Sequence, residues 1–507
     1  MLEQLAMAPF KHLTTGEITA LAGTALVVYL TGLYAYRLLL HPLRSFPGEK
    51  LAALSEWHWC YHAKDSSSYL PVLHQKYGPV VRIAPNSLHF SDYRAYHDIY
   101  SPGSKFIKDR HYYNSFDQEE CSFGWSDPQL AKARKDVLSP LFSRRAILKL
   151  ERVVQEKVDL LFSQILVHSN GPVDLYYAFR SMTTDIITSY CFAECFSLVT
   201  YPNFQHPVLP AMDSAVELLW ALLAFPFLLV VLPWVEAVMG YINTDIKAAL
   251  DLRVRLTAQV DKLLKDPGSL EGAEHEIIYH HLMNPKPGKS VNDFKMPSRT
   301  SLIHESANLL FAGSDTVGNT ITVGTFHVLD SERIQRLLVQ ELTQAWPELE
   351  SPMSLAKLEK LPYLTAVIKE SLRMSSGVVS PQPRIVRPDS TVIAGVTVPA
   401  GTSVSICSTF VHYNSDIFTD PTVFNPERWL QPDSAKLDNF QVAFSRGPRS
   451  CLGINLAWCE LYLIFATLFR KLDMKLYETS VDDLKYKSYF LPAYAGHLRA
   501  RVRAKMS

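Results

Sequence analysis

Cysteine is scarce in this sequence, and neither sign of charge is in excess. The 507 residues include 7 cysteines, an odd and scattered set that excludes the disulfide framework of a small secreted protein. Lys and Arg total 50, as do Asp and Glu, so the chain lacks the positive field that nucleic-acid binding requires. It also has no Asn-x-Ser/Thr glycosylation sequon, which favours a body that faces the cytosol. We expect no nucleic-acid partner.

Hydrophobic residues are plentiful and repeat with helical spacing over most of the chain. They make up 48% of it, against 20% for charged residues, so a large core can form. A length of 507 residues suggests about three units. However, no low-complexity linker or internal repeat divides the chain after its N-terminal part. The sequence therefore predicts one large domain, mainly α with a small β portion.

Helical periodicity and strand signals occupy separate segments. The clearest predicted helices are Ala146–Leu166, Leu302–Leu329, Arg333–Ala345 and Tyr363–Met374. The predicted hairpins join Val80–Ile83 to Leu88–Phe90, and Thr391–Val398 to Ser403–Ile406.

The run Ile18–Tyr36 contains no charged residue. As a helix it would measure roughly 28 Å, close to a hydrocarbon core of about 30 Å. Arg37, Arg44 and Lys50 follow it, so the positive-inside rule places the rest of the chain in the cytosol. A cleaved signal peptide is the alternative. It would need a basic start and a shorter apolar stretch, whereas acidic residues outnumber basic ones before this run.

We therefore predict a single-pass protein of the endoplasmic reticulum membrane. Its parts are a lumenal tail over 1–17, a transmembrane helix over 18–40, a proline-rich hinge over 41–50 and a body over 51–507. Leu218–Val235 is a second charge-free run, but Pro226 and Pro233 interrupt it. We interpret it as one or two broken helices that are buried or dip into the membrane interface. Plain core packing is the alternative.

The strongest chemical signal is the segment from Phe444 to Gly453, Phe-Ser-Arg-Gly-Pro-Arg-Ser-Cys-Leu-Gly. Its glycines allow tight backbone geometry around Cys451, Phe444 is placed to shield the sulfur, and Arg449 adds a cation. A helix pattern over Ile454–Phe469 begins directly afterwards, and a thiolate near a helix N-terminus is stabilised by unpaired N–H groups. The other cysteines lack such surroundings and are interpreted as small buried hydrophobic residues.

This segment resembles the haem-binding signature of the cytochrome P450 family, Phe-x-x-Gly-x-Arg-x-Cys-x-Gly, at every fixed position. The resemblance implies a single large cytochrome P450-type haem-thiolate domain with haem b as its cofactor. It implies that Cys451 is the axial ligand of the iron and that Arg449 contacts a haem propionate. The cofactor-binding residues of this segment would be Phe444, Gly447, Arg449, Cys451 and Gly453.

A second match is the run Glu-Ser-Leu-Arg at 370–373, where opposite charges share one helix face. Alone, such a pair is usually solvated. Here it resembles the family's Glu-x-x-Arg motif, and the segment around Arg428 resembles the one that supplies a third member. The resemblance implies that Glu370, Arg373 and Arg428 form a buried, structural charge network that holds the cysteine loop. Trp429 stands where the family usually has Phe.

An acid and an alcohol, Asp315 and Thr316, interrupt an otherwise apolar helix pattern. A polar turn at the surface is one interpretation. By the family resemblance they lie in the oxygen-binding groove, which implies that both are catalytic and relay protons to bound dioxygen. The next position is often Thr or Ser in the family and is Val317 here.

Two further arginines match family positions that contact haem propionates. Arg384 follows shortly after the Glu-x-x-Arg helix. Arg134 lies in the helix pattern Gln129–Leu138, where the family commonly has Trp or His about one turn before an Arg, but Leu130 and Ala131 stand there instead. We predict both arginines as cofactor-binding residues.

The resemblance implies a membrane-anchored monooxygenase that inserts one oxygen atom into an apolar small molecule. No Gly-x-Gly-x-x-Gly fingerprint occurs in the chain. NADPH electrons would therefore come through a separate flavoprotein reductase on the same membrane face. A haem-thiolate isomerase or dehydratase acting without reductase is the alternative, and the acid–alcohol pair argues against it. A non-catalytic haem binder is the third interpretation.

The segments His41–Gly48 and Lys76–Asn86 are most similar to fungal members that serve secondary-metabolite pathways, the trichodiene oxygenase group among them. Segments expected to line a distal pocket are apolar or aromatic, which suits a hydrophobic ligand. We therefore expect hydroxylation or epoxidation of a terpenoid, with a polyketide as the second choice.

Overall fold

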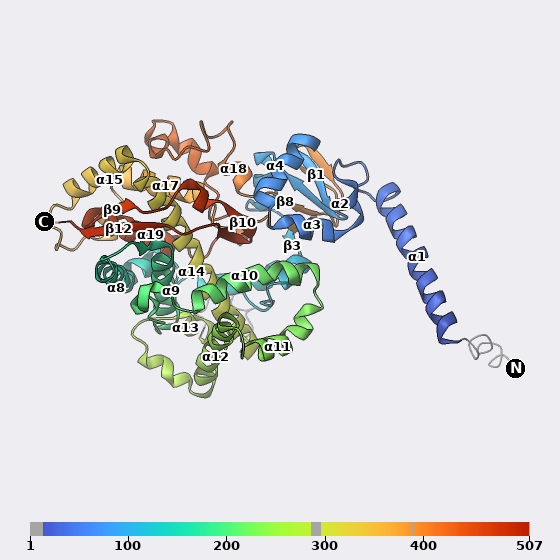
Figure 1. Ribbon diagram of the computed structural model, residues 1–507, viewed down its shortest axis with the longest axis horizontal. Helices are drawn as coiled ribbons and strands as arrows, with labels where there is room; N and C mark the ends of the chain where they lie inside the picture. The colour runs from blue at the N-terminus through green and yellow to red at the C-terminus, as the bar shows by residue number, and fades with distance from the viewer. Residues whose placement is uncertain (1–13, 285–295, 388, 506–507) are drawn as a thin grey trace.

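One helix projects from a mainly helical body, and the largest sheet of that body lies at the end beside this helix (Figure 1). The computed structural model describes residues 14–284, 296–387 and 389–505. The helices are α1 (Thr15–Leu39), α2 (Lys50–Leu54), α3 (Glu56–Ala63), α4 (Ser66–Tyr77), α5 (Tyr93–Tyr100), α6 (Arg110–Asn114), α7 (Pro128–Leu138), α8 (Arg144–Val167), α9 (Leu175–Phe192), α10 (Val208–Ala224), α11 (Leu228–Met239), α12 (Thr244–Lys265), α13 (Ile278–Met283), α14 (Arg299–Leu329), α15 (Glu332–Ala345), α16 (Leu355–Leu358), α17 (Pro362–Ser375), α18 (Thr409–His412) and α19 (Ile454–Lys471). The strands are β1 (Val80–Ala84), β2 (Ser87–Phe90), β3 (Ile107–Lys108), β4 (Val173–Asp174), β5 (Arg384–Ile385), β6 (Thr391–Ile393), β7 (Val396–Val398), β8 (Ser403–Ser405), β9 (Leu472–Leu476), β10 (Tyr486–Tyr489), β11 (Leu491–Tyr494) and β12 (Arg499–Ala504). The predicted fold, mainly α with a small β portion, is confirmed.

The four predicted helices are present. α17 begins at Pro362, and the other three begin slightly before the first apolar repeat, because a serine caps each of those three. Ser143 precedes α8, Ser298 precedes α14 and Ser331 precedes α15. In each case the serine side chain accepts a hydrogen bond from an N–H of the first turn. α14 is the centre of the helical part, since α9, α12, α17 and α19 all pack against it. Most of its side chains are buried, so its polar residues need hydrogen-bond partners, which are carbonyls one turn earlier in α14 or groups on other elements.

The largest sheet has the strand order β1-β2-β8-β5-β3. β1 and β2 form the first predicted hairpin. The second predicted hairpin, Thr391–Val398 with Ser403–Ile406, is wrong. β6 pairs with β7 inside the first of those segments, since Ala394 and Gly395 adopt φ of 47° and 81° and close a tight turn. β8 lies instead between β2 and β5 of the largest sheet.

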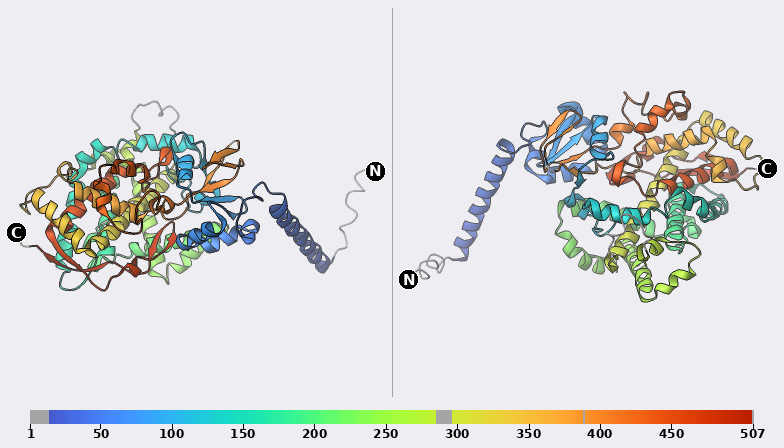
Figure 2. Two further views of the ribbon diagram at one scale, coloured as in Figure 1. Left: turned by 90° about the horizontal axis from the view of Figure 1, so that it is seen from above. Right: turned by 180° about the vertical axis from the view of Figure 1, so that it is seen from behind.

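α1 stands clear of the body in all three ribbon views (Figures 1 and 2). Thr14 and Glu17 form a capping box at its start, and none of its residues is buried. Its other end is tied to the sheet. The Arg82 guanidinium donates to the Arg37 carbonyl at 3.1 Å, and the Arg82 N–H donates to the Pro47 carbonyl at 2.8 Å. The segment between α1 and the body is therefore fixed to β1 at both of its ends.

Among the residues that the structure describes, two helical segments are long and apolar enough to cross a membrane, Thr15–Leu39 and Pro202–Ala224, judged by length and composition. The second is 28% buried within the body. α11 and α12, bent by 112° to each other, also pass the same test as a pair. The predicted single pass therefore stays a prediction. Residues 1–13 of the predicted lumenal tail over 1–17 lie outside the described residues.

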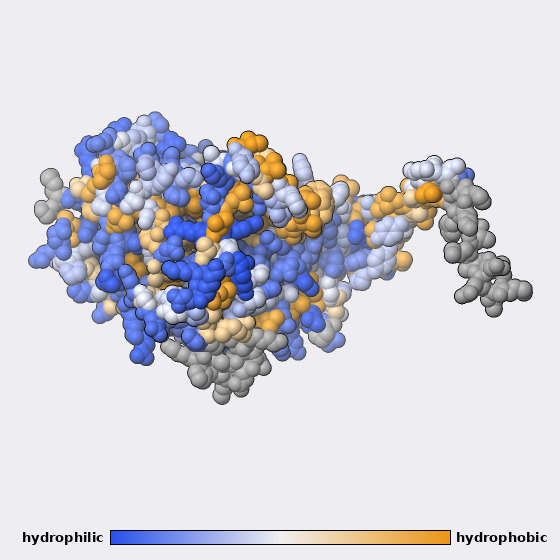
Figure 3. All heavy atoms as spheres, turned by 90° about the horizontal axis from the view of Figure 1, so that it is seen from below, coloured by the Kyte–Doolittle hydropathy of each residue, from blue (hydrophilic) through white to orange (hydrophobic). Residues whose placement is uncertain are grey.

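The charge-free run Leu218–Val235 is broken at Pro226, as that proline predicts, with α10 ending before it and α11 beginning after it. The predicted interruption at Pro233 is wrong, because Pro233 lies inside α11. The two helices differ in exposure. α10 contributes residues to the core, whereas no residue of α11 is buried, and Val230 and Trp234 are 74% and 78% exposed. Figure 3 shows further hydrophobic side chains, in orange, along α1 and on the adjoining part of the body.

Candidate functional site

A cavity of about 740 Å³ lies inside the body, bordered by α14, α10 and the loop that precedes α19. Residues distant in the sequence meet there. The residues of chemical interest that line it are Lys108, Lys135, Ala312, Gly313, Thr316, Arg384, Phe444, Arg449, Cys451 and Gly453. The cysteine loop and the alcohol of α14 therefore face one common space.

The loop before α19 presents the Cys451 sulfur to this cavity. Gly447 adopts φ of 66°, and a Cβ there would lie 2.4 Å from the Tyr100 carbonyl oxygen, so a side chain would collide with backbone. The Cys451 N–H donates to the Phe444 carbonyl at 2.8 Å. Gly453 is the N-cap of α19. The chain thus makes the tight turn and helix start that the sequence predicted.

The Cys451 thiol is accessible from the cavity, although protein surrounds it on its other sides. Burial raises the pKa of this thiol, while the Gly453 N–H and the Lys135 ammonium lower it by less. The N-terminus of α19 therefore does not by itself keep the Cys451 thiol ionised. A coordinated metal ion would do so, because it deprotonates a thiol. In the part of the chain that the structure describes, no group of three His, Cys, Asp or Glu side chains is placed to hold a metal ion. The site therefore fits an iron that a porphyrin ligates and that needs one protein sulfur.

Two arginines face the cavity as the sequence predicted, Arg384 buried and Arg449 half-buried. Arg449 donates to the Trp125 carbonyl at 2.7 Å, and Arg384 donates to the Tyr113 hydroxyl at 2.7 Å. Burial, followed by the repulsion of Arg384, lowers the pKa of Arg449 to about 10. Neither guanidinium pairs with a carboxylate of the described residues. Two cations with only neutral partners, one buried and one half-buried, fit a ligand with two carboxylates, as haem has.

The structure does not bring Arg134 to this cavity. Its guanidinium lies 2.8 Å from the Glu305 carboxylate, and the two side chains are 2% and 0% exposed. Successive residues of an α-helix point about 100° apart, so Lys135 lines the cavity instead. The Lys135 ammonium also donates to the Ser450 carbonyl at 2.8 Å. This placement corrects the expectation that Arg134 contacts a propionate, because Lys135 is the cation of α7 at the site.

Lys108 is a further buried cation of the cavity that the sequence did not predict. It pairs with Arg384 across β3 and β5. Its ammonium donates to the Phe123 carbonyl at 2.6 Å and lies 4.0 Å from the centre of the Tyr113 ring. Burial, followed by Arg384 and Arg449, lowers the pKa of Lys108 well below its usual range. No local motif marks this lysine, because only the long-range strand pairing brings it to the site.

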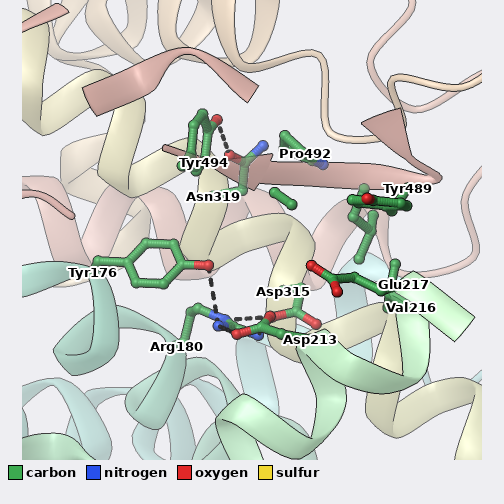
Figure 4. A pocket seen from close by; sticks show the side chains of 12 residues that line it. Tyr176, Arg180, Asp213, Val216, Glu217, Asp315, Asn319, Tyr489, Pro492 and Tyr494 are labelled. Atoms are coloured by element: carbon green, nitrogen blue, oxygen red, sulfur yellow. Dashed lines mark hydrogen bonds and ion pairs between the residues drawn. The ribbon is translucent and has the colours of Figure 1, made fainter. Parts of the chain in front are cut away.

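The predicted acid–alcohol pair divides between two sides of α14. The Thr316 hydroxyl donates to the Ala312 carbonyl at 2.8 Å, and both residues line the large cavity. Asp315 faces α9, where Arg180 Nε lies 2.5 Å from its carboxylate (Figure 4). Burial raises the pKa of Asp315, and nearby Asp213 adds to the increase, while Arg180 opposes it. A carboxyl in this position binds a proton more readily than one at the surface.

The charge network has the members that the resemblance implies and one more. The Glu370 carboxylate lies 2.8 Å from Arg373 and 3.1 Å from Arg428. All three side chains are buried. The Trp429 indole N–H donates to the same carboxylate at 2.9 Å. Tryptophan in place of the family's phenylalanine therefore adds a hydrogen bond to this network.

His412 links this network to the cysteine loop. The Arg373 guanidinium donates to the His412 carbonyl at 2.7 Å, and the Val442 N–H donates to the His412 ring at 3.0 Å. Burial lowers the pKa of His412 to about 3, so the ring is neutral and can accept that bond. Val442 lies two residues before Phe444, at the start of the loop. The charge network thus reaches the loop through one histidine that no sequence motif indicated.

Comparison with known proteins extends the likeness over nearly the whole chain. The family model of cytochrome P450 matches residues 47–495. The chain is 33% identical over 500 residues to cytochrome P450 monooxygenase macH of Penicillium terrestre, covering 96% of this chain and 97% of that protein. It is 31% identical over 526 aligned positions to cytochrome P450 monooxygenase flvC of Aspergillus flavus, covering 96% of each. It is 34% identical over 469 residues to conidiogenone synthase PchP450 of Penicillium rubens, covering 90% of this chain and 92% of that protein.

Proposed function

Since this chain belongs to the cytochrome P450 family and is a monooxygenase of that family, we propose that it hydroxylates or epoxidises an apolar small molecule of a fungal secondary-metabolite pathway. The observation that carries the proposal is the composition of one cavity. Cys451, a set of cations without carboxylate partners, and Thr316 of α14 line the same cavity. This is the arrangement needed to ligate haem, bind its propionates and supply a proton beside it.

Haem b, when bound, supplies the binding and reduction of dioxygen. In this proposal Cys451 would ligate its iron, and Phe444, Gly447 and Gly453 shape the loop around the sulfur. Arg384, Arg449 and Lys135 hold the propionates, and Lys108 adds positive charge behind Arg384. The buried network of Glu370, Arg373 and Arg428 keeps the cysteine loop in place through His412. These roles are supported by the contacts described above.

Proton supply is the part of the reaction that α14 performs. Thr316 carries a hydroxyl at the cavity wall, where it can accept one hydrogen bond while it donates another. Asp315, its neighbour, is a buried carboxyl that can take up a proton and release it towards the cavity. Apolar walls exclude bulk water, so protons must arrive through such groups.

The cavity walls favour a hydrophobic substrate. Residues of α9, α10, α14 and the β10–β11 turn contribute aliphatic or aromatic side chains, among them Ile187, Met212, Leu219, Leu222, Leu309, Phe311 and Phe490. The similarity to the trichodiene oxygenase group favours a terpenoid, with a polyketide as the second choice.

The family implies a reductase as electron donor, and we propose an NADPH-dependent flavoprotein on the cytosolic face of the endoplasmic reticulum. α1 is the proposed anchor, with 18–40 in the bilayer, 41–50 as the connection and 51–507 as the catalytic domain. α11 adds a second apolar surface, where Trp234 faces outward and Leu232 lines the cavity. One helix therefore separates the proposed lipid surface from the substrate space.

A haem-thiolate isomerase or dehydratase that needs no reductase is the second candidate. The orientation of Asp315 favours it, because this carboxyl faces Arg180 and not the large cavity. Such an enzyme would rearrange an already oxidised substrate without NADPH or dioxygen.

The deciding experiment is expression of the full chain with a reductase in a host that supplies terpenoid scaffolds. We expect product formation to require NADPH and the product to carry one ¹⁸O atom from ¹⁸O₂. Thr316→Ala should lower product per NADPH by about 10²-fold and release hydrogen peroxide instead. Ser314→Ala, which removes a neighbouring hydroxyl bonded to the Leu310 carbonyl at 2.7 Å, should leave this ratio unchanged. Product formed without NADPH, or without ¹⁸O, would support the second candidate instead.

A further inference from the structure

One polar side chain of α14 in the large cavity has no part in the chemistry described so far. Asn308 lines that cavity and is 9% exposed. It lies four residues before Ala312 and eight before Thr316, and both of these residues also line the cavity. Residues at this spacing share one face of a helix. Asn308 therefore belongs to the face of α14 that borders the substrate space.

The Asn308 amide is held in one orientation by its neighbours. Its nitrogen donates to the Glu305 carboxylate and to the Ser122 hydroxyl oxygen, each at 3.3 Å. A carboxylate only accepts hydrogen bonds, so the amide nitrogen and not the amide oxygen faces Glu305. Among the residues that the structure describes, no donor bonds to the Asn308 carbonyl oxygen. This oxygen is therefore the free acceptor of a side chain that lines the cavity.

The Glu305 carboxylate is fixed in turn by three bonds. The Arg134 guanidinium lies 2.8 Å from it, and Ser122 donates to it through its N–H at 2.9 Å and its hydroxyl at 2.6 Å. Arg134, which the structure places away from the large cavity, thus fixes the acid that orients Asn308. An amide that is fixed before a ligand arrives loses little freedom on binding, so its hydrogen bond adds to the affinity.

A donor lies one turn away on the same helix. His304 also lines the large cavity. Its Nδ1 accepts a hydrogen bond from the Glu120 N–H at 3.3 Å, so the proton of the neutral ring is on Nε2. The cavity therefore has an acceptor at Asn308 and a donor at His304. A hydroxyl both donates and accepts, so one such group satisfies both side chains, whereas a hydrocarbon leaves both without a partner.

We propose that Asn308, with His304, is a specificity-determining residue that binds a hydroxyl group already present on the substrate. The proposal rests on the proposed function and deepens it, since the substrate is then a terpenoid alcohol and not a terpene hydrocarbon. An α-helix rises about 1.5 Å per residue, so the hydroxyl binds about 12 Å along α14 from Thr316, and the new oxygen enters at a carbon remote from it. A reaction that introduces oxygen, either a hydroxylation or a cyclisation that ends in capture of water, must come before this one.

The first test needs no variant. The probes are three scaffolds, cedrane, farnesane and phytane, each as its alcohol, its methyl ether and the parent hydrocarbon, and the Kd of each is measured by equilibrium dialysis against the full-length, haem-loaded protein. The ether can still accept from His304 but cannot donate to Asn308. We expect the alcohol of at least one scaffold to bind about 10-fold more tightly than its ether and its hydrocarbon, as one added hydrogen bond allows. Absence of this preference on every scaffold would overturn the inference.

The second test compares Asn308→Leu with Thr300→Val, both loaded with haem to the wild-type level. Thr300 is exposed, lies eight residues before Asn308 on α14 and lines the same cavity. Asn308→Leu should abolish the preference for the alcohol and leave binding of the hydrocarbon unchanged, whereas Thr300→Val should keep the preference. Equal weakening of alcohol and hydrocarbon in Asn308→Leu would show a structural role and overturn the inference.

Failure of this inference and failure of the proposed function are distinguishable, because dialysis requires no turnover. Equal binding of alcohol, ether and hydrocarbon by a protein that forms product with NADPH would overturn this inference alone. Absence of NADPH-dependent product from the wild type would overturn the proposed function and, with it, the assignment of the alcohol as substrate.

Discussion

At the scale of single residues, position relative to the cavity separates Cys451 from the other cysteines. Burial raises the pKa of the Cys459 thiol well above its usual range, which is the behaviour of an inert, structural thiol. Burial also raises the pKa of the Cys451 thiol, but its sulfur faces the cavity beside Lys135. Of the two, Cys451 alone has room for a ligand at its sulfur.

Cys451→Ser should therefore abolish the thiolate-type carbon-monoxide difference band of the reduced enzyme, since a serine oxygen is a poor substitute for the sulfur ligand. The measurement is the difference spectrum of membranes that contain equal amounts of protein. Cys459→Ser, on the following helix, serves as the control and should keep the band. A Cys451→Ser variant with a normal band and normal turnover would contradict the assignment.

Trp429 offers a second prediction at this scale, because its indole N–H is a partner of a buried carboxylate. Trp429→Phe restores the family's usual residue but removes one hydrogen bond from Glu370, which should destabilise the fold by about 1–3 kcal/mol. The midpoint of urea-induced loss of the haem spectrum would report it. Trp57→Phe, at a position that is 61% exposed, should leave the midpoint unchanged. An equal midpoint in both variants would show that the indole N–H contributes nothing.

At the scale of elements, the turn before α19 depends on a glycine for two separate reasons. Gly447 has φ of 66° and no space for a Cβ, whereas Gly401 has φ of 79° and open space around it. Ala at either position should cost roughly 1–2 kcal/mol through the left-handed backbone. Gly447→Ala should in addition displace the loop and reduce haem content, measured per mole of purified protein. Equal haem content in Gly447→Ala and Gly401→Ala would contradict this account.

The same elements show what local sequence can predict and what it cannot. Apolar repeats alone placed α8, α14 and α15 to within a few residues, because that signal is local. The residues added at their starts are explained by the serine caps seen in the structure. The signature around Cys451 identified the loop, since its glycines have direct backbone consequences. No local motif indicates Lys108 or His412, because only contacts between segments distant in the sequence bring these residues to the site. The sequence predicted Arg134 as the cofactor-binding residue of α7 where the structure has Lys135, because residue spacing does not determine how a short helix is rotated. The rotation of α7 places the arginine at Glu305.

At the scale of the whole molecule, two apolar surfaces are available for a bilayer, α1 and the outer side of α11. Removal of residues 1–40 should release part of the protein from membranes, and the rest should remain as a peripheral, carbonate-extractable population. Adding Trp234→Glu to the truncated chain should release most of the remainder, because a charge on this surface opposes insertion. Val167→Glu, at the end of α8 and 64% exposed, is the matched control. Complete release by truncation alone, or retention of the double variant, would contradict a role for α11.

The position of α11 between an outer apolar surface and the large cavity has a consequence for how turnover depends on concentration. A hydrophobic ligand that enters beside α11 is drawn from the lipid phase, so its partition coefficient determines the amount available to the protein. The apparent KM, expressed per litre of suspension, should rise in proportion to the quantity of added lipid. Expressed as mole fraction in the bilayer, it should stay constant. Poor solubility in water would then be no barrier to catalysis. Added lipid would act as an inhibitor, because it dilutes the ligand within the bilayer.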